Sequence, residues 1–220
     1  MPAQASRASP APLAATAGLV VVKLGGSVVR SGDLAAWLEA IAAASRPTVI
    51  VPGGGAMADE VRACQSQLGF GDKAAHRMAL LAMDQLAWAV AGLGQGLAVG
   101  ATEPELRAVL ERGQVAVWAP YALVAERSDI EASWRLTSDS LALWLARRLG
   151  AVRCYLVKSI VRKGDGMSAR QLAGDGVVDA AFPDMVRDAG MPAFLLGRGD
   201  QHALAACLAG QTEHCGAAID

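Results

Sequence analysis

Two segments of the sequence combine glycine-rich backbone with the end of an apolar run. The run Leu19–Val22 leads into Lys23-Leu24-Gly25-Gly26-Ser27, and the run Thr48–Val51 leads into Pro52-Gly53-Gly54-Gly55. In an α/β fold such loops lie at the carboxyl ends of strands, where ligands bind, and glycine lets backbone N–H groups approach an anion closely. The pair of loops predicts a site where two phosphate-bearing groups meet, as phosphoryl transfer requires.

Each loop also has an ordinary structural interpretation. A lysine at the end of a strand can extend its ammonium group to solvent, although hiding it is unfavourable unless an anion meets it. The first loop has neither the G-x-x-x-x-G-K-[ST] nor the G-x-G-x-x-G spacing. The second loop could be a loose turn, but a single glycine would serve that purpose, so we favour contact with a charged ligand.

A third segment, Arg135-Leu136-Thr137-Ser138-Asp139-Ser140, is typical of a helix start. Thr137 or Ser138 could cap the helix, and a carboxylate in the first turn suits the helix dipole. Two phosphate-binding loops need cations, however, and cations need an acidic group to organise them. Asp139 is the candidate for that role.

The elements that position these residues alternate between strand and helix. The expected strands are 19–22, 48–51, 115–118, 153–157 and 193–196, and the expected helices are 33–45, 57–68, 72–93, one capped by Thr102, 138–149, 182–189 and 200–208. This alternation predicts an α/β fold with a mostly parallel sheet covered on both faces. We expect a flexible extension over residues 1–17, which are rich in Ala, Pro and Ser, and one domain over 18–220.

Composition narrows the function classes. The 220 residues are 53% hydrophobic and 19% charged, with a formal net charge of −1, which gives no electrostatic footprint for nucleic acid or an anionic membrane. Four cysteines without C-x-x-C spacing indicate ordinary thiols rather than a disulfide framework or a metal site, and we assign no metal ligand. The apolar stretch 78–101 is interrupted by Asp84, Gln85 and glycines, so it is expected to be a buried helix. We therefore expect a cytoplasmic protein that binds small molecules.

The three motifs K-x-G-G-S, P-G-G-G and T-S-D-x-L-A, in this order over about residues 19–200, resemble the amino acid kinase superfamily. The resemblance implies a three-layer α/β/α fold, an acceptor half over about 18–135, a nucleotide half over about 136–220, and homo-oligomers. It also implies ATP and Mg²⁺ as cofactors.

Residue roles follow from the same resemblance. Lys23 would meet the transferring phosphoryl group, and Asp139 would hold the catalytic lysines. The loop Gly25, Gly26 and Ser27 would bind the nucleotide phosphates, and the loop Gly53, Gly54 and Gly55 the acceptor.

The sequence departs from the family pattern at two places. The stretch Leu156-Val157-Lys158-Ser159-Ile160-Val161 stands where members usually carry a Thr-Asp pair, and no lysine follows residue 163, although members tend to have a second catalytic lysine downstream. Lys158 or Lys163 could supply that charge instead. We count Lys158, Ser159 and Lys163 as candidate nucleotide-binding residues.

The segment Asp72–Gln85 suggests the acceptor, because A-A-H-x-M-A-x-L-A-M-D-Q is similar to the small kinases that phosphorylate an aminomethylfuran phosphate in the biosynthesis of methanofuran-type cofactors. We expect His76 and Arg77 to contact the acceptor, with Arg77 on its phosphate, and Asp84 to meet its amine. Packing is an equally good explanation for His76. The alternatives are another phosphate-acceptor kinase, of the uridylate or isopentenyl phosphate type, and a noncatalytic nucleotide- or oxyanion-binding member of the fold.

Overall fold

A computed structural model describes residues 18–161, 164 and 166–220. The expected extension over 1–17 and the candidate Lys163 lie outside these residues. The strands are β1 (Val20–Leu24), β2 (Thr48–Pro52), β3 (Leu97–Gly100), β4 (Val115–Trp118), β5 (Arg153–Val157), β6 (Gly166–Met167), β7 (Ala193–Leu196) and β8 (Ala217–Ile219). The helices are α1 (Gly26–Arg30), α2 (Leu34–Ala42), α3 (Gly55–Leu68), α4 (Asp72–Leu93), α5 (Glu103–Glu111), α6 (Tyr121–Val124), α7 (Ser138–Leu149), α8 (Ala169–Gly174), α9 (Phe182–Asp188) and α10 (Gln201–Leu208).

The described strands form one sheet in the order β3-β4-β2-β1-β5-β7-β8-β6. Every pair is parallel except β7 with β8. The chain runs outward from β1 through β2 on one side and returns to pair β5 with β1 on the other, so the direction of winding reverses at β1. In such sheets the ligand crevice lies beyond the carboxyl ends of the strands at this reversal.

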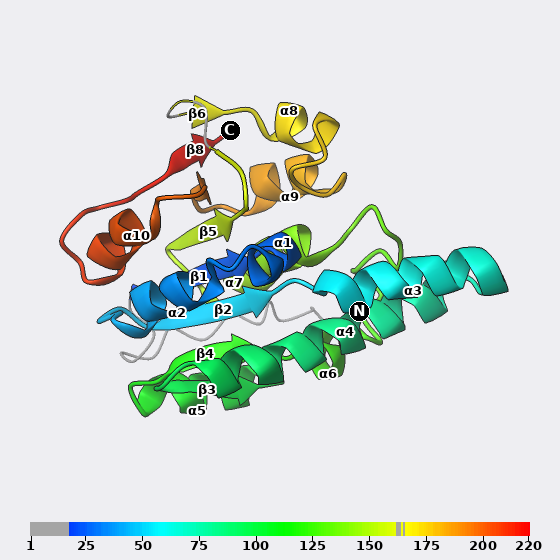
Figure 1. Ribbon diagram of the computed structural model, residues 1–220, viewed down its shortest axis with the longest axis horizontal. Helices are drawn as coiled ribbons and strands as arrows, with labels where there is room; N and C mark the ends of the chain where they lie inside the picture. The colour runs from blue at the N-terminus through cyan, green and yellow to red at the C-terminus, as the bar shows by residue number, and fades with distance from the viewer. Residues whose placement is uncertain (1–17, 162–163, 165) are drawn as a thin grey trace, which may run out of the picture.

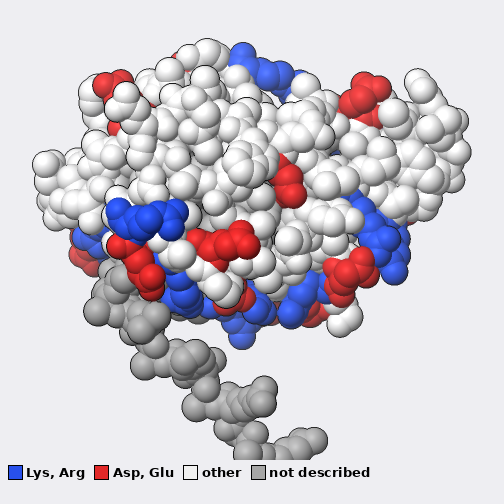
Figure 2. Space-filling view, turned by 90° about the horizontal axis from the view of Figure 1, so that it is seen from below, with Lys and Arg blue, Asp and Glu red and all other residues white. Residues whose placement is uncertain are grey.

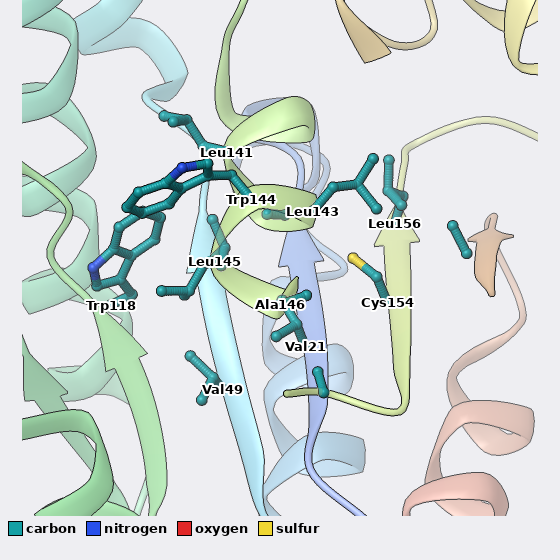
Figure 3. Packing of buried hydrophobic residues seen from close by; sticks show 14 of the residues in the cluster. Val21, Val49, Trp118, Leu141, Leu143, Trp144, Leu145, Ala146, Cys154 and Leu156 are labelled. Carbon is teal, nitrogen blue, oxygen red and sulfur yellow. The ribbon is translucent and has the colours of Figure 1, made fainter. Parts of the chain in front are cut away.

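The alternation of side chains along β1 explains the two covered faces. Val20, Val22 and Leu24 pack toward α2 and α10, whereas Leu19 and Val21 pack into the core under α7 and α9. Figure 3 shows Leu145 and Ala146 of α7 beside Val49 of β2 and Val21 of β1, while Leu143 extends toward Leu156 of β5. Trp144 of α7 stacks beside Trp118. The sheet is thus a middle layer between helices, as expected from the sequence.

Two helices extend the molecule beyond the sheet. In Figure 1 the strands β1 and β2 point to the right, and α3 and the first turns of α4 lie beyond their ends. The second half of α4 packs through Ala87 and Val90 beside β2 and β4, while Leu80 and Met83 of its first half face the space beyond the strands. This arrangement gives the crevice one wall made of helices.

Among the described residues no helix is both long and apolar enough to cross a membrane, and this includes α4. All four cysteines are free thiols, and Cys154, Cys207 and Cys215 are buried.

Candidate active site

A cavity of about 480 Å³ lies at the carboxyl ends of β1, β2 and β5, a volume typical of small-ligand sites. Both glycine loops line it, as do Lys23, Asp139 and the segment Lys158–Ile160. The sequence-predicted residues that line it are Lys23, Gly25, Gly26, Ser27, Gly53, Gly54, Gly55, His76, Asp139, Lys158 and Ser159. Most of the predicted site therefore converges on one space.

The two glycine loops pack directly on each other. A Cβ added at Gly26 would lie 2.7 Å from the backbone N and Cα of Gly55, and one added at Gly53 would lie 2.8 Å from the backbone N of Gly26. Gly55 also adopts a φ of +54°, which disfavours a side chain. Glycine is therefore needed here first for loop-to-loop contact, and that contact brings the free faces of both loops to the same cavity.

Asp139 lies between two lysines at the base of the cavity. Its Oδ1 is 2.7 Å from Nζ of Lys23, and its Oδ2 accepts a hydrogen bond of 2.7 Å from Nζ of Lys158. The side chains of Lys23 and Asp139 are only 3% and 6% exposed, and that of Lys158 is 12% exposed. The three groups carry one net positive charge in a nearly water-free place, which suits the binding of a polyanion.

The ionisation of this cluster follows from burial and its internal charges. Burial raises the pKa of Asp139, but the ammonium groups of Lys23 and Lys158 outweigh it and hold the pKa below its usual value. Burial and the neighbouring Lys23 lower the pKa of Lys158 to about 8, against the opposing effect of Asp139. Lys158 therefore titrates near pH 8.

A pH profile should show this titration. The apparent kcat/KM for ATP, which reports the free enzyme, is expected to fall about tenfold per pH unit above pH 8, because Lys158 loses its proton there. Lys158→Arg should remove this limb, since a guanidinium group stays protonated, whereas Lys73→Arg, an exposed control outside the cavity, should keep it. A limb that persists in Lys158→Arg would assign the titration to another group.

Asp179 organises the start of α7, a role that sequence reasoning missed. Its carboxylate accepts hydrogen bonds from the backbone N–H groups of Thr137 (2.9 Å) and Ser140 (3.0 Å), and from both of their hydroxyls. Thr137 occupies the cap position, as expected, but its side chain makes no capping hydrogen bond to the helix. Since Asp179 satisfies these donors, the carboxylate of Asp139 is left to hold the lysines.

Two expected acceptor contacts lie elsewhere. Arg77 does not line the cavity, and its guanidinium group pairs with Glu126. Asp84 is half-buried outside the cavity, where its carboxylate accepts the backbone N–H of Tyr121 (3.0 Å) at the start of α6. The structure therefore does not bring these two side chains to the cavity. Successive helical residues point about 100° apart, so His76 lines the cavity and Arg77 does not.

Several cavity residues carried no sequence signal, because distant segments bring them together. They are Arg30, Asp59, Arg62, Asp72, Trp134 and Asp175. The indole Nε1 of Trp134 donates to Oε1 of Gln65 at 2.6 Å, across 69 positions of sequence. This contact fixes the loop between α6 and α7 against α3.

Comparison with known proteins identifies the family of the chain. The model of the amino acid kinase family matches residues 18–161. The chain belongs to the amino acid kinase family. The chain is therefore a phosphotransferase.

Similar proteins include one curated kinase and several solved structures. The chain is 27% identical over 187 residues to the [5-(aminomethyl)furan-3-yl]methyl phosphate kinase of Methanocaldococcus jannaschii. The matched region covers 80% of the chain and 86% of that protein. Its fold is similar to uridylate kinase from Archaeoglobus fulgidus (TM-score 0.69, 18% identity, 91% of this chain and 99% of that one). It is also similar to aspartate kinase from Synechocystis (TM-score 0.67, 16% identity), covering 91% of this chain but 39% of that one.

Proposed function

We propose that this kinase transfers the γ-phosphoryl group of ATP to the phosphate of [5-(aminomethyl)furan-3-yl]methyl phosphate and forms the corresponding diphosphate. The observation that carries the proposal is the pair of buried ammonium groups on Asp139, at the meeting point of the two glycine loops. The similarity to the Methanocaldococcus jannaschii enzyme supports the choice of acceptor.

The residues of the cavity fit a nucleotide. The hydroxyl of Ser159 is buried, lines the cavity and has no hydrogen-bond partner within the described residues, so it is available as a donor. Among these residues no group of three or more His, Cys, Asp or Glu side chains could hold a metal. Mg²⁺ is commonly held by substrate phosphates with one or two carboxylates and water, so ATP would carry it into the site, where it would neutralise charge on the phosphates.

The proposed reaction is an in-line displacement. A phosphate oxygen of the acceptor forms a bond to the γ-phosphorus while the bond from that phosphorus to the β,γ-bridging oxygen breaks, and ADP leaves. Lys23 and Lys158 stabilise the charge on the transferring group, and Asp139 holds both ammonium groups in place. The first glycine loop (Gly25–Ser27) orients the nucleotide and the second (Gly53–Gly55) orients the acceptor.

His76 has a role on the acceptor side of this scheme. Burial lowers the pKa of its imidazole, so the ring is neutral at pH 7. A neutral imidazole can donate one hydrogen bond without adding charge. We assign it to the orientation of the acceptor.

The proposed function is tested by ADP release in the presence of ATP, Mg²⁺ and candidate acceptors. The furan phosphate should be turned over with a kcat/KM at least about tenfold above those of UMP and isopentenyl phosphate, and its unphosphorylated alcohol should be inactive. A preference for UMP would favour a uridylate kinase, and nucleotide binding without turnover of any acceptor would favour a noncatalytic protein.

The exposed face of α4 supports a homo-oligomer. Met78, Leu81, Gln85 and Trp88 are exposed at spacings of three and four, and Leu81 and Trp88 are 45% and 68% exposed. Figure 2, which views the side where α4 and α5 lie, shows a broad area without charged side chains. Because a two-fold axis pairs a surface with itself, we propose that a second copy covers this face. Leu81→Glu should then lower the mass measured by sedimentation, and an unchanged mass would exclude this interface.

We also propose a cytoplasmic location for this reaction. The four free cysteines support it, because reduced thiols are usual in that compartment.

A further inference from the structure

The acceptor side of the cavity contains an arginine whose hydrogen-bonding edge is free. Two arginines line the cavity, Arg30 and Arg62. Arg30 pairs with Asp59 at 3.1 Å. Among the described residues, Arg62 makes no hydrogen bond and no ion pair, and its contact is the ring of Trp134, with Cζ 4.3 Å from the ring centroid.

A guanidinium group stacked on an indole is oriented without using its N–H groups. The contact between Cζ of Arg62 and the indole ring uses none of the five N–H groups as a hydrogen-bond donor. These N–H groups can bind two oxygens of one phosphate with parallel hydrogen bonds. The guanidinium group of Arg62 is therefore held against the indole ring of Trp134, and its N–H groups remain available to bind a phosphate.

The indole itself is held by a chain of hydrogen bonds from two helices. Trp134 donates to Oε1 of Gln65 on α3 at 2.6 Å, and Nε2 of Gln65 donates to Oδ1 of Asp72 on α4 at 2.8 Å. Gln65 and Arg62 are three residues apart and thus share one face of α3. The loop between α6 and α7 and both helices together set the position of the arginine.

The place of Arg62 along α3 also fits the acceptor. Seven residues separate it from Gly55, which corresponds to about 10 Å along a helix, and helical side chains lean back toward the N-terminus. That direction leads toward Gly53–Gly55, the loop assigned to the acceptor. We propose that Arg62, oriented by Trp134, binds the phosphate of the acceptor and takes the role first expected for Arg77. This inference rests on the proposed function.

The first test compares two arginine-to-lysine variants with the furan phosphate as acceptor. A lysine keeps the charge but cannot form the two parallel bonds, so Arg62→Lys should raise the acceptor KM by at least about tenfold and leave the ATP KM within about twofold. Arg77→Lys is the matched control and should leave both KM values unchanged. An unchanged acceptor KM in Arg62→Lys, or an equal rise in the ATP KM, would overturn the proposal.

The role of Trp134 has its own comparison. Trp134→Phe keeps an aromatic face, whereas Trp134→Leu removes it. The leucine variant should reproduce the rise in acceptor KM with little change in kcat, and the phenylalanine variant should lie between it and the wild type. Equal effects of both substitutions on kcat alone would indicate a loop-packing role and contradict the proposed orientation of Arg62.

A binding measurement separates this proposal from the proposed function. With the nucleotide loop filled by a nonhydrolysable ATP analogue, calorimetry would measure the affinity for inorganic phosphate. Arg62→Lys should weaken it about tenfold and Arg77→Lys should not. If the wild type fails to phosphorylate the furan compound but shows this difference, the acceptor was misidentified and the phosphate site stands. If phosphate binds equally to both variants, the site is refuted.

Discussion

Asp139→Asn is expected to lower kcat by roughly 10²–10³-fold and to destabilise the protein. The substitution keeps the shape of the side chain but removes the charge that neutralises Lys23 and Lys158, both of which are buried. The loss of a preorganised electrostatic group has an effect of this size on kcat. Removing one partner of a buried ion pair costs about 3–5 kcal/mol of unfolding free energy, which urea denaturation would measure.

The pH dependence of the unfolding free energy tests whether the ionised carboxylate of Asp139 is the stabilising group. Because the pKa of Asp139 is lowered in the folded state, its contribution is present above the unfolded pKa of about 4 and is lost as pH falls through the folded value. The difference in unfolding free energy between wild type and Asp139→Asn should therefore shrink in acid. Asp84→Asn is the control: its side-chain oxygen still accepts the N–H of Tyr121, and activity should stay within about twofold. Full turnover in Asp139→Asn would remove this residue from the mechanism.

Lys23→Ala is expected to lower kcat by roughly 10²–10³-fold while the protein stays folded. Lys158 continues to neutralise Asp139 in this variant, so one ion pair of the cluster survives. The descending limb of the pH profile should also move above pH 8, because Lys23 is one of the groups that lower the pKa of Lys158. A change in kcat without this displacement would mean that the two ammonium groups do not interact, and unchanged kcat would exclude Lys23 from the reaction.

The fold was largely predictable because its strong elements carry local patterns. The apolar runs that become β1, β2 and β5 end in the residues of the cavity, and α4 and α7 have the bounds that the sequence predicts. The strands β3, β6 and β8 were missed because they are short and lack long apolar runs. The helices α1, α6 and α8 were missed because each is only four to six residues long.

The site residues were predictable only where the regular element that carries a residue also determines where its side chain points. Lys23, Asp139 and Lys158 end or begin regular elements, so sheet topology alone brings them together. Asp179 acts on a helix about forty positions earlier, and Trp134 contacts Gln65 across 69 positions. Neither contact produces a hydrophobic periodicity or a local motif in the sequence. Each depends on the tertiary arrangement of segments that are far apart in the chain.

The contact between the glycine loops limits how acceptor specificity can change. Substituting Gly26 or Gly53 would push one loop off the other and, under the proposed function, disturb the nucleotide and acceptor positions together. Variation that selects a new acceptor must therefore be confined to surfaces that leave this contact intact, namely α3, the start of α4 and the loop that carries Trp134. The contact between the loops and the surface proposed to recognise the acceptor are thus physically separate parts of one cavity, so we expect that a new substrate can be acquired without changing the lysine cluster.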